Sequence, residues 1–453
     1  MENGAGDDSA DRYDRYLSHI AKKRNPSALR ALQALYGIPD MIFLAGGQPN
    51  PSTIPFAEVQ VTLKDGTSMR ISGNECQRAF QYGLSGGMQP MIEWAKSHME
   101  NVHRRKRSPY WDLIMTSGSQ EGLHQTLAAL IEEGDNVLVE RPVYSGAVAT
   151  IRPLGAHMVG IGMDGEGLMA DEMDRVLTNW DEKSQGRKPK LLYTVPTGHN
   201  PSGITLSNPR RRAVYNVAVK HDLLICEDDP YYFVQLDIPE SNQDLPEDDW
   251  GRVTQLTSFW SLDGEADEKS VVGNRVVRFD SASKILSAGL RIGWLTGPAP
   301  IVQRVLLHQQ CSSIHPSSLS QTLVLSLMTQ WGDAGLIKHI RDTVQATYRA
   351  KLKASAAACD KHLSRLATWM VPRAGMFLWL NLLNVDDSRA LVEGGFREAG
   401  VAVVSGRDFS PNDEKSNGIR IAYSNITSHD QVDLAFSRLA KALHALSEKK
   451  EAK

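Results

Sequence analysis

The chain has 453 residues, 41% hydrophobic and 23% charged, with 36 Gly and 21 Pro, which excludes a collagen-like or disordered chain and allows two or three domains. Fifty Lys and Arg against 53 Asp and Glu give a formal charge of -3, so a whole-chain electrostatic grip on nucleic acid or an anionic membrane is excluded. Four cysteines lie far apart without a C-x-x-C pair, and no apolar run approaches the roughly 20 residues that span a bilayer.

The first segments of the chain predict a tail followed by a short helix. Residues 1 to about 12 are acidic and Gly-rich, without the apolar core of a secretory signal or the Arg-rich character of a transit peptide. We therefore expect a cytoplasmic protein. A helical stretch is expected over 13–23, because the following Asn25-Pro26 pair ends a helix.

From Asp112 onward, apolar strands alternate with amphipathic helices. Strands are predicted from 112 to the TSGSQ segment, then at 136–140, 190–197, 223–229, 275–281 and 291–297, with helices after 119 and over 209–221. This order predicts an α/β fold with a mixed, mostly parallel sheet between helices. The acidic, turn-rich stretch 239–274 is expected to be a surface excursion.

After about Leu319 the pattern changes to long helices, then strands at MFLWLNLL and IRIAYS, then a final helix. The sequence therefore predicts three parts: an N-terminal tail and arm over 1–45, a large domain over 46–318, and a smaller C-terminal α/β domain over 319–453.

Polar side chains follow four of the predicted strands, and strand ends are where such sheets bind ligands. The first segment, 117–122, turns directly into a helix and aims N–H groups and hydroxyls at one point, as a phosphate site requires. Taken alone it is more often a simple helix cap. The turn at 197–203 and the acids and phenols at 227–232 are, alone, a loop and a solvated strand end.

The fourth segment, 280–293, has one lysine between small hydroxyl residues and one arginine after it. A lone lysine is usually a surface residue. Here the lysine offers an amine for a carbonyl group, and the cations suit an attached phosphate, which together are what pyridoxal phosphate demands.

These four segments, in this order and spacing, resemble the class I pyridoxal-phosphate aminotransferases of fold type I. Within them, the resemblance is strongest to the kynurenine/2-aminoadipate aminotransferases and the fungal aromatic aminotransferases. It covers nearly the whole chain and is carried by RNPSALR at 24–30, FLAGGQPNP at 43–51, QYGLSGG at 81–87, TSGSQEGL at 116–123, ERPVYSG at 140–146, YTVPTGHNPSG at 193–203, EDDPYYFVQ at 227–235, the lysine segment and AGMFLWL.

The resemblance implies a role for each matching residue. Lys284 should bind the cofactor's aldehyde carbon, be displaced by the substrate amine and then carry the proton between the substrate Cα and the cofactor. Asp228 should keep the pyridine nitrogen protonated, with Asp229 as its rival. Asn200 and Tyr231 should hydrogen-bond the cofactor's phenolic oxygen, and Asn200 should also contact the substrate.

The remaining cofactor contacts follow from the same resemblance. Tyr144 should stack on the cofactor ring, although a buried core aromatic is the alternative. Tyr82 matches a position that reaches the phosphate of a neighbouring subunit, which implies a homodimer with shared active sites. The matching phosphate pocket consists of Ser119, Gln120, Ser281, Ser283 and Arg291.

Substrate recognition is expected at three further positions. Arg420 lies in an alternating strand, where an unpaired guanidinium is costly to bury, and it matches the family's arginine for the substrate carboxylate. A bidentate fork suits that group, and an internal salt bridge is the alternative. Arg30 and Gly47 match positions that line the pocket for the substrate side chain.

The expected activity is ping-pong transfer of an amino group from an aromatic amino acid, kynurenine or 2-aminoadipate to a 2-oxo acid such as 2-oxoglutarate. A lyase or decarboxylase on the same cofactor is the alternative. A regulatory module is a weaker one, because only about 40 residues precede the first cofactor-fold motif. Ser202, Ala282 and Gln48 depart from the relatives, and Gln48 leaves substrate preference open.

Three other signals do not favour a functional site. The G-x-G-x-x-G match at 160–165 is followed by a helix signal only near Ala170, so no dinucleotide site is expected. The basic run 103–107 is expected to be a solvated helix end rather than a nucleic-acid site. The 13 histidines show no H-E-x-x-H or other ligand spacing, so no metal is expected.

Overall fold

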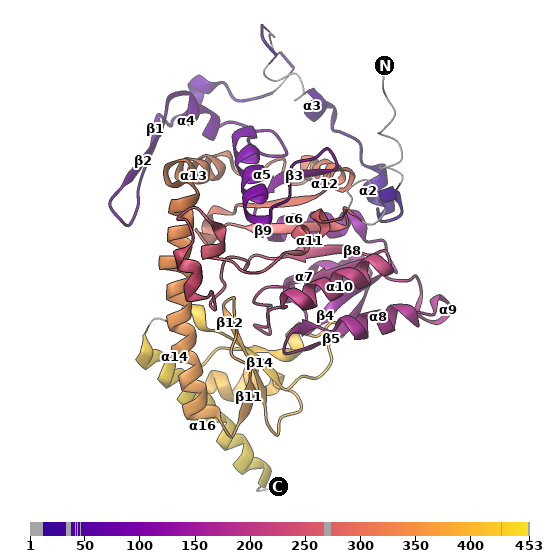
Figure 1. The fold of residues 1–453 in the computed structure, drawn as a ribbon, viewed down its shortest axis with the longest axis vertical. Coiled ribbons are helices and arrows are strands. Elements are labelled where there is room, and N and C mark those ends of the chain that lie inside the picture. The colour runs from indigo at the N-terminus through magenta and orange to yellow at the C-terminus, as the bar shows by residue number, and fades with distance from the viewer. Residues whose placement is uncertain are drawn as a thin grey trace. The chain divides into compact units, whose positions relative to one another are not determined.

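The structure is a computed structural model, and it describes residues 12–32, 38–40, 42, 44–45, 47–266, 273–426 and 428–451 (Figure 1). These residues form two compact units. One takes its residues from Met1–Glu133, Leu224–Pro230 and Ser258–Leu336, and the other from Gly134–Leu223, Tyr231–Thr257 and Ile337–Lys453. This division interleaves with the predicted three-part organisation, whose boundaries stay a prediction.

The first unit is built on four strands in the order β3 (Trp111–Thr116), β10 (Gly293–Pro298), β9 (Val276–Ser281) and β8 (Leu224–Asp228). Strand β10 is antiparallel to both its neighbours, whereas β8 and β9 are parallel. Helices α5 (Gln89–His103), α6 (Ser119–Leu130), α11 (Phe259–Gly264) and α12 (Ala299–Cys311) pack on these strands. The apolar residues of these four strands are buried, as is expected of a sheet that helices cover.

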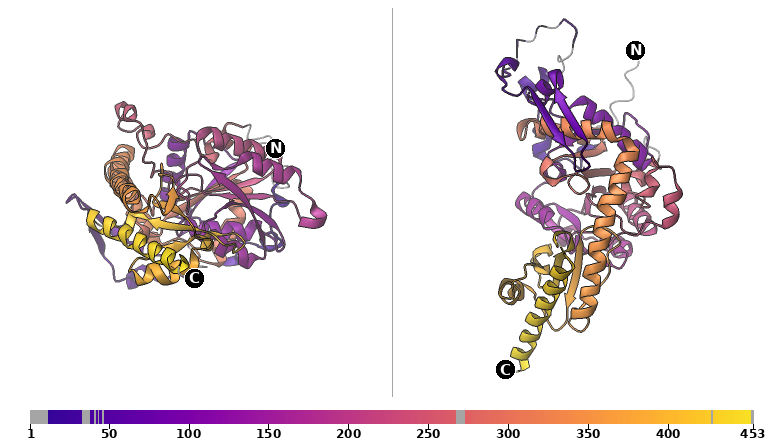
Figure 2. Two further views of the ribbon diagram at one scale, coloured as in Figure 1. Left: turned by 90° about the horizontal axis from the view of Figure 1, so that it is seen from below. Right: turned by 90° about the vertical axis from the view of Figure 1, so that its left-hand side faces the viewer.

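Other elements of the first unit precede or follow these strands. An antiparallel hairpin of β1 (Glu58–Thr62) and β2 (Ser68–Ser72) lies beside α4 (Gly73–Ala79) (Figure 2). The predicted helix over 13–23 is broken, since its described core is α2 (His19–Lys23), which Ser18 caps. The remaining elements are α3 (Ala28–Ala31), η2 (Pro51–Thr53), η6 (Ala288–Leu290) and α13 (Ser318–His339), which has a kink at Gly332.

The second unit contains strands in the order β7 (Leu191–Thr194), β4 (Asn136–Arg141), β5 (His157–Asp164) and β6 (Gly167–Leu168). Strand β4 is parallel to β5 and β7, and β6 is antiparallel to β5. The helices that follow them are α7 (Ser145–Ile151), η3 (Arg152–Leu154), α8 (Ala170–Thr178), α9 (Glu182–Gln185) and α10 (Asn208–Lys220). The alternation of strands and helices predicted from the sequence is confirmed here.

A second, antiparallel sheet lies in the same unit, with the order β11 (Ala367–Trp369), β12 (Phe377–Leu382), β14 (Gly418–Ala422) and β13 (Val404–Ser405). Helices α14 (Ala346–Leu363) and α16 (His429–Glu451) lie side by side (Figure 2). The shorter segments are η4 (Glu240–Asp244), η5 (Trp250–Arg252), η7 (Ile340–Gln345), α15 (Arg389–Leu391), η8 (Val392–Phe396), η9 (Gly406–Phe409) and η10 (Tyr423–Asn425).

Two sequence predictions are wrong in part. The stretch 239–274 is not only a surface excursion, because Trp250, Phe259 and Trp260 within it are buried; its aromatic residues outweigh its turn-rich composition. In the basic run 103–107, Arg105 is 3% exposed. Its guanidinium pairs with Asp263 at 3.0 Å and lies 3.8 Å from the Trp260 ring, so it is an internal cation.

Candidate active site

The turn from β3 into α6 forms an anion cradle. Gly118 has φ +85°, and a Cβ there would collide with the guanidinium of Arg291. That guanidinium donates to the Ser117 carbonyl at 3.1 Å and to the Ser283 hydroxyl at 3.4 Å. Ser119 begins α6, where the first N–H groups of a helix have no intrahelical acceptor. A helix N-terminus, an exposed arginine and a hydroxyl at one turn suit a phosphate group.

Two further residues of the predicted phosphate pocket belong to this region. Ser281 ends β9 and accepts the Ser283 N–H at 3.1 Å, so both lie in the same turn. Gln120 is the second residue of α6 and is half-buried. The structure thus gathers the serines and Arg291 around the start of α6 and the end of β9.

Lys284 lies three residues beyond β9 and is half-buried. Its turn is fixed by two backbone hydrogen bonds, from the Ala282 N–H to the Ile292 carbonyl at 3.0 Å and from the Leu286 N–H to the Ala282 carbonyl at 2.9 Å. A lysine in bulk solvent would have contradicted the predicted role. Instead, this amine belongs to the same loop as Arg291.

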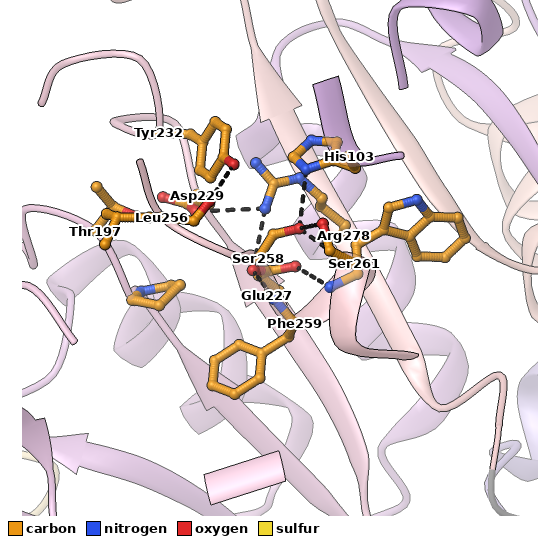
Figure 3. Close-up of polar contacts among 12 residues, drawn as sticks. His103, Thr197, Glu227, Asp229, Tyr232, Leu256, Ser258, Phe259, Ser261 and Arg278 are labelled. Carbon is orange, nitrogen blue, oxygen red and sulfur yellow. Dashed lines mark hydrogen bonds and ion pairs between the residues drawn. The ribbon is translucent and has the colours of Figure 1, made fainter. Parts of the chain in front are cut away.

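Asp228 ends β8, next to β9, where its register partner is Phe279. Its neighbour Asp229 places a carboxylate oxygen 3.3 Å from Arg278 Nη1, and Figure 3 shows Asp229, Glu227 and Arg278 pointing toward one another. Successive residues of a strand point to opposite faces. The two adjacent aspartates therefore present their carboxylates on different faces of β8, and the carboxylate that binds Arg278 belongs to Asp229.

Arg420, in the second unit, has a guanidinium that pairs with no carboxylate among the residues that the structure describes. It lies on β14 between β12 and β13. Its Nη1 donates to Asn200 Oδ1 at 2.7 Å, and its Cζ lies 4.5 Å from the Phe377 ring and 5.0 Å from the Phe409 ring. Its buried Nε has no hydrogen-bond partner in the described chain. The internal salt bridge considered from the sequence is not found there.

Burial lowers the pKa of Arg420, and the phenols of Tyr231 and Tyr144 oppose that shift. Tyr231 is 4% exposed and meets Phe377 edge-on at 5.8 Å between ring centroids. The Tyr144 ring covers Gly146, where a Cβ would lie 2.5 Å from ring carbons. Both phenols therefore belong to the surroundings of Arg420. A half-buried cation with unused donor capacity suits an incoming carboxylate.

The turn that carries Asn200 is held by groups that the sequence prediction missed. Glu140 and His199 are fully buried, and the carboxylate of Glu140 lies 3.1 Å from His199 Nε2. Glu140 also accepts from the Thr194 hydroxyl at 2.6 Å and the Val195 N–H at 2.9 Å, and Ser202 Oγ lies 2.8 Å from His199 Nδ1. Their positions in ERPVYSG and PTGHNPSG were the available signal, but no local pattern shows that they meet.

The N-terminal candidates are not brought into either group by any described contact. Tyr82 is 49% exposed and meets the His315 ring edge-on at 6.0 Å. Gly47 is exposed, and a Cβ added to its backbone would meet no described atom within 4 Å. Arg30 lies in α3, and its side chain is outside the described part.

The G-x-G-x-x-G match at 160–165 runs along β5 and into the turn before β6, so it does not join a strand to a helix. Among the described residues, no group of three or more His, Cys, Asp or Glu side chains is arranged to hold a metal ion. No helix of the described chain is both long and apolar enough to cross a bilayer.

Comparison with known proteins gives one family. Residues 40–439 match the family described as aminotransferase class I and II. The mitochondrial kynurenine/alpha-aminoadipate aminotransferase of Bos taurus is 38% identical over 95% of this chain and 99% of its own. Aromatic amino acid aminotransferase C569.07 of Schizosaccharomyces pombe is 32% identical over 91% of this chain and 94% of its own.

Solved structures agree with the sequence relatives. Aminotransferase Aro8 from Candida albicans superposes with a TM-score of 0.81 and 28% identity, covering 95% of this chain and 97% of its own. The kynurenine aminotransferase of Pyrococcus horikoshii, solved with PMP, has a TM-score of 0.72 and 27% identity, covering 95% and 98%. The anion cradle, half-buried lysine and buried aspartate fit such a phosphorylated cofactor. The chain therefore belongs to the class I and II aminotransferases, and it is a transaminase of fold type I that uses pyridoxal 5'-phosphate.

Proposed function

We propose that the enzyme moves the amino group of an aromatic amino acid, kynurenine or 2-aminoadipate to a 2-oxo acid, with 2-oxoglutarate as the acceptor. The observation that carries this proposal is Arg420, a cation bound to Asn200 at 2.7 Å with no described carboxylate partner. The bovine and fission-yeast relatives, named for these classes of donor, support the choice. Both substrates of such a reaction carry a carboxylate that one arginine can hold.

The residues of the first unit are proposed to hold the cofactor, which when bound supplies an electron sink for the substrate's Cα. Lys284 provides the amine that binds it and then moves the proton at Cα. The Asp228 carboxylate holds a proton on the ring nitrogen. Its neighbour Asp229 is engaged by Arg278, which supports Asp228 over its rival. The phosphate is assigned to Ser119, Gln120, Ser281, Ser283 and Arg291.

The residues around Arg420 are proposed to orient the substrate and the cofactor's phenolic oxygen. Because a guanidinium only donates, its bond to Asn200 Oδ1 leaves the Nδ2–H₂ group of that amide as a donor. Such a donor, with the Tyr231 hydroxyl, suits a phenolic oxygen, and Asn200 is also assigned to the substrate. Tyr144 is assigned to the ring face. Arg30 and Gly47 are proposed for the side-chain pocket.

We further propose a homodimer in which Tyr82 serves the partner's active site, with neither nucleic acid nor a membrane as partner. The 49% exposure of Tyr82 allows its ring to contact another chain. A cytoplasmic location is proposed from composition, although the bovine relative's name places that protein in mitochondria; fractionation of cells that express the gene tests it.

A half-reaction experiment tests the activity. The holoenzyme is mixed with each of a panel of amino acids, and the visible absorbance of its cofactor is followed, first without and then with 2-oxoglutarate. We expect tryptophan, phenylalanine, tyrosine, kynurenine or 2-aminoadipate to bleach the band and 2-oxoglutarate to restore it. Lys284→Ala should show neither change. Release of ammonium or carbon dioxide in place of reversible bleaching would indicate a lyase or decarboxylase instead.

A further inference from the structure

A buried arginine outside the assigned site binds three carboxylates at the ends of β8 and β9. Arg278 Nη1 lies 3.0 Å from Glu227 and 3.3 Å from Asp229, and its Nη2 lies 2.9 Å from Asp280. Its Nε donates to both Asp280 oxygens at 3.0 Å. Arg278 and Glu227 are fully buried, so water does not screen these contacts. We call these four residues the Arg278 cluster.

The Arg278 cluster is fixed from several sides. Glu227 accepts the N–H group of Phe259, the first residue of α11, at 2.8 Å (Figure 3). It also accepts the N–H group of Trp260 at 3.0 Å. Asp280 is the register partner of Trp294, whose ring meets the His98 ring of α5 edge-on at 5.7 Å. The guanidinium therefore has one geometry, set by the strands β8, β9 and β10 and by the helices α5 and α11 that cover them.

The charges of the Arg278 cluster do not balance, since one guanidinium faces three carboxyl groups. Burial alone would lower the pKa of Arg278, but Asp280, Glu227 and Asp229 together raise it well above its ordinary value. Burial raises the pKa of Asp280, which the guanidinium opposes. Removing Arg278 would therefore leave a surplus of acid groups in an environment that disfavours their ionised forms.

Asp228 is bonded through the backbone to two members of this cluster, Glu227 and Asp229. Because strand residues alternate, the cluster holds the residues on both sides of Asp228 against one face of β8 and so directs the Asp228 side chain to the other. On the neighbouring strand, Asp280 is the last residue but one of β9, and the turn that carries Lys284 follows this strand. The cluster thus adjoins Asp228 in the chain and lies on the strand that leads to Lys284.

We propose that Arg278 is a positioning residue for the cofactor: by binding the residues on either side of Asp228 it fixes the direction of the Asp228 carboxylate, and its charge offsets the three acids that lie beside that carboxylate in the chain and on the neighbouring strand. This proposal rests on the proposed role of Asp228. If the Arg278 cluster were purely structural, loss of Arg278 would lower the stability of the protein without altering the properties of the bound cofactor.

The chain offers a matched control in the same unit. Arg105 is also a buried arginine, paired with Asp263 at 3.0 Å and stacked on Trp260. It is not adjacent in sequence to any residue assigned to the cofactor. Arg105→Met should therefore lose stability as Arg278→Met does, but without effect on cofactor binding.

The experiment compares Arg278→Met, Arg278→Lys and Arg105→Met as holoenzymes and after removal and titration of pyridoxal phosphate. Three quantities are measured: thermal midpoint, cofactor Kd, and the pH midpoint of the cofactor's visible band. For Arg278→Met we expect the Kd to rise about tenfold or more. The pH midpoint should rise by about half a unit or more, because loss of a cation favours protonated forms nearby. Arg278→Lys, which keeps the charge, should restore the pH midpoint.

A second variant gives the opposite sign and covers the case in which Arg278→Met does not fold. Asp229→Asn replaces one acid of the cluster by an uncharged side chain of similar shape. Because a negative charge is lost, the pH midpoint of the cofactor's visible band should fall in this variant. The inference is overturned if Arg278→Met or Asp229→Asn leaves Kd within about twofold and the pH midpoint unchanged, as Arg105→Met should. Asp228→Asn and Lys284→Ala report on the proposed function itself. If these also bind cofactor normally, it is the assignment of the site that fails.

Discussion

Replacing Arg420 by Met should damage catalysis far more than folding. In the folded protein the change removes a charge-assisted bond to Asn200 and contacts with the Phe377 and Phe409 rings, together worth about 2–4 kcal/mol. It also removes a half-buried cation that no described carboxylate pairs with. Burying such a charge costs about several kcal/mol of desolvation, so its removal stabilises the folded protein. The two effects oppose each other. The free energy of unfolding should therefore change by less than about 2 kcal/mol, whereas breaking a buried ion pair costs about 3–5 kcal/mol.

The loss of substrate binding in Arg420→Met is not offset by an opposing effect. Loss of the partner of a buried carboxylate costs about 2–5 kcal/mol, so kcat/KM for the amino acid should fall roughly 30-fold to several thousand-fold. Arg420→Lys keeps the charge but loses the planar fork, and should fall between Met and wild type. Steady-state kinetics with donor and acceptor varied separately give these values, and urea unfolding gives stability.

A half-buried arginine of the same unit, which has carboxylate partners, provides the control. Arg407 pairs with Asp413 at 2.8 Å and Asp387 at 3.1 Å, and Arg407→Met should leave kcat/KM unchanged. The reasoning is refuted if Arg420→Met loses about 3 kcal/mol or more of stability while its KM for the amino acid stays at the wild-type value. That result would mean that Arg420 is an internal structural cation.

Three other predictions address the cradle, acid stability and assembly. Gly118→Ala should weaken pyridoxal phosphate binding about tenfold or more, because the added Cβ meets the Arg291 guanidinium. Gly66 has a similar φ of +88° but lies in open space, so Gly66→Ala should not weaken binding. Equal effects of the two changes in a cofactor titration would contradict the anion cradle. Burial lowers the pKa of His98 to about 3, whereas the unfolded chain should titrate near about 6.5. Between these pH values the unfolded chain binds one proton more than the folded protein. The contribution of neutral His98 to the free energy of unfolding is therefore fully present above about pH 6.5 and is lost as the pH falls. Urea unfolding at pH 7.5 and 5.0 should show wild type losing about 2 kcal/mol more than His98→Phe, and equal losses would reject this account. Mixing inactive Tyr82→Ala and Lys284→Ala proteins should recover part of the activity if subunits share sites, whereas no recovery counts against sharing.

Much of the fold could be predicted because its strands are short apolar runs with clear ends. The sequence predicts a strand at 223–229 where β8 is Leu224–Asp228, and another at 275–281 where β9 is Val276–Ser281. Composition is a poorer guide at 239–274, where turn residues dominate but Phe259 and Trp260 are buried against the strands. Average composition does not show which few aromatic residues a helix turns inward.

The sequence predicts that Lys284 and Arg291 share one loop after a strand, and the structure places both between β9 and β10; their roles stay a prediction. The candidate site was not predictable where function depends on which side chains meet. Nothing local distinguishes Asp228 from Asp229, and only the contact between Asp229 and Arg278 separates them. Likewise, Arg105 has the pattern of a solvated basic run until Asp263, far along the chain, is placed against it.

The bond between Arg420 and Asn200 has an evolutionary consequence. One amide contacts the arginine assigned to the substrate and is itself assigned to the cofactor's oxygen. With the roles proposed for these two residues, a mutation that changes substrate affinity through Arg420 is expected to change the electronic properties of the bound cofactor as well. Natural variation in donor preference is therefore expected at positions outside this pair, such as Gln48, which follows the Gly47 proposed for the side-chain pocket.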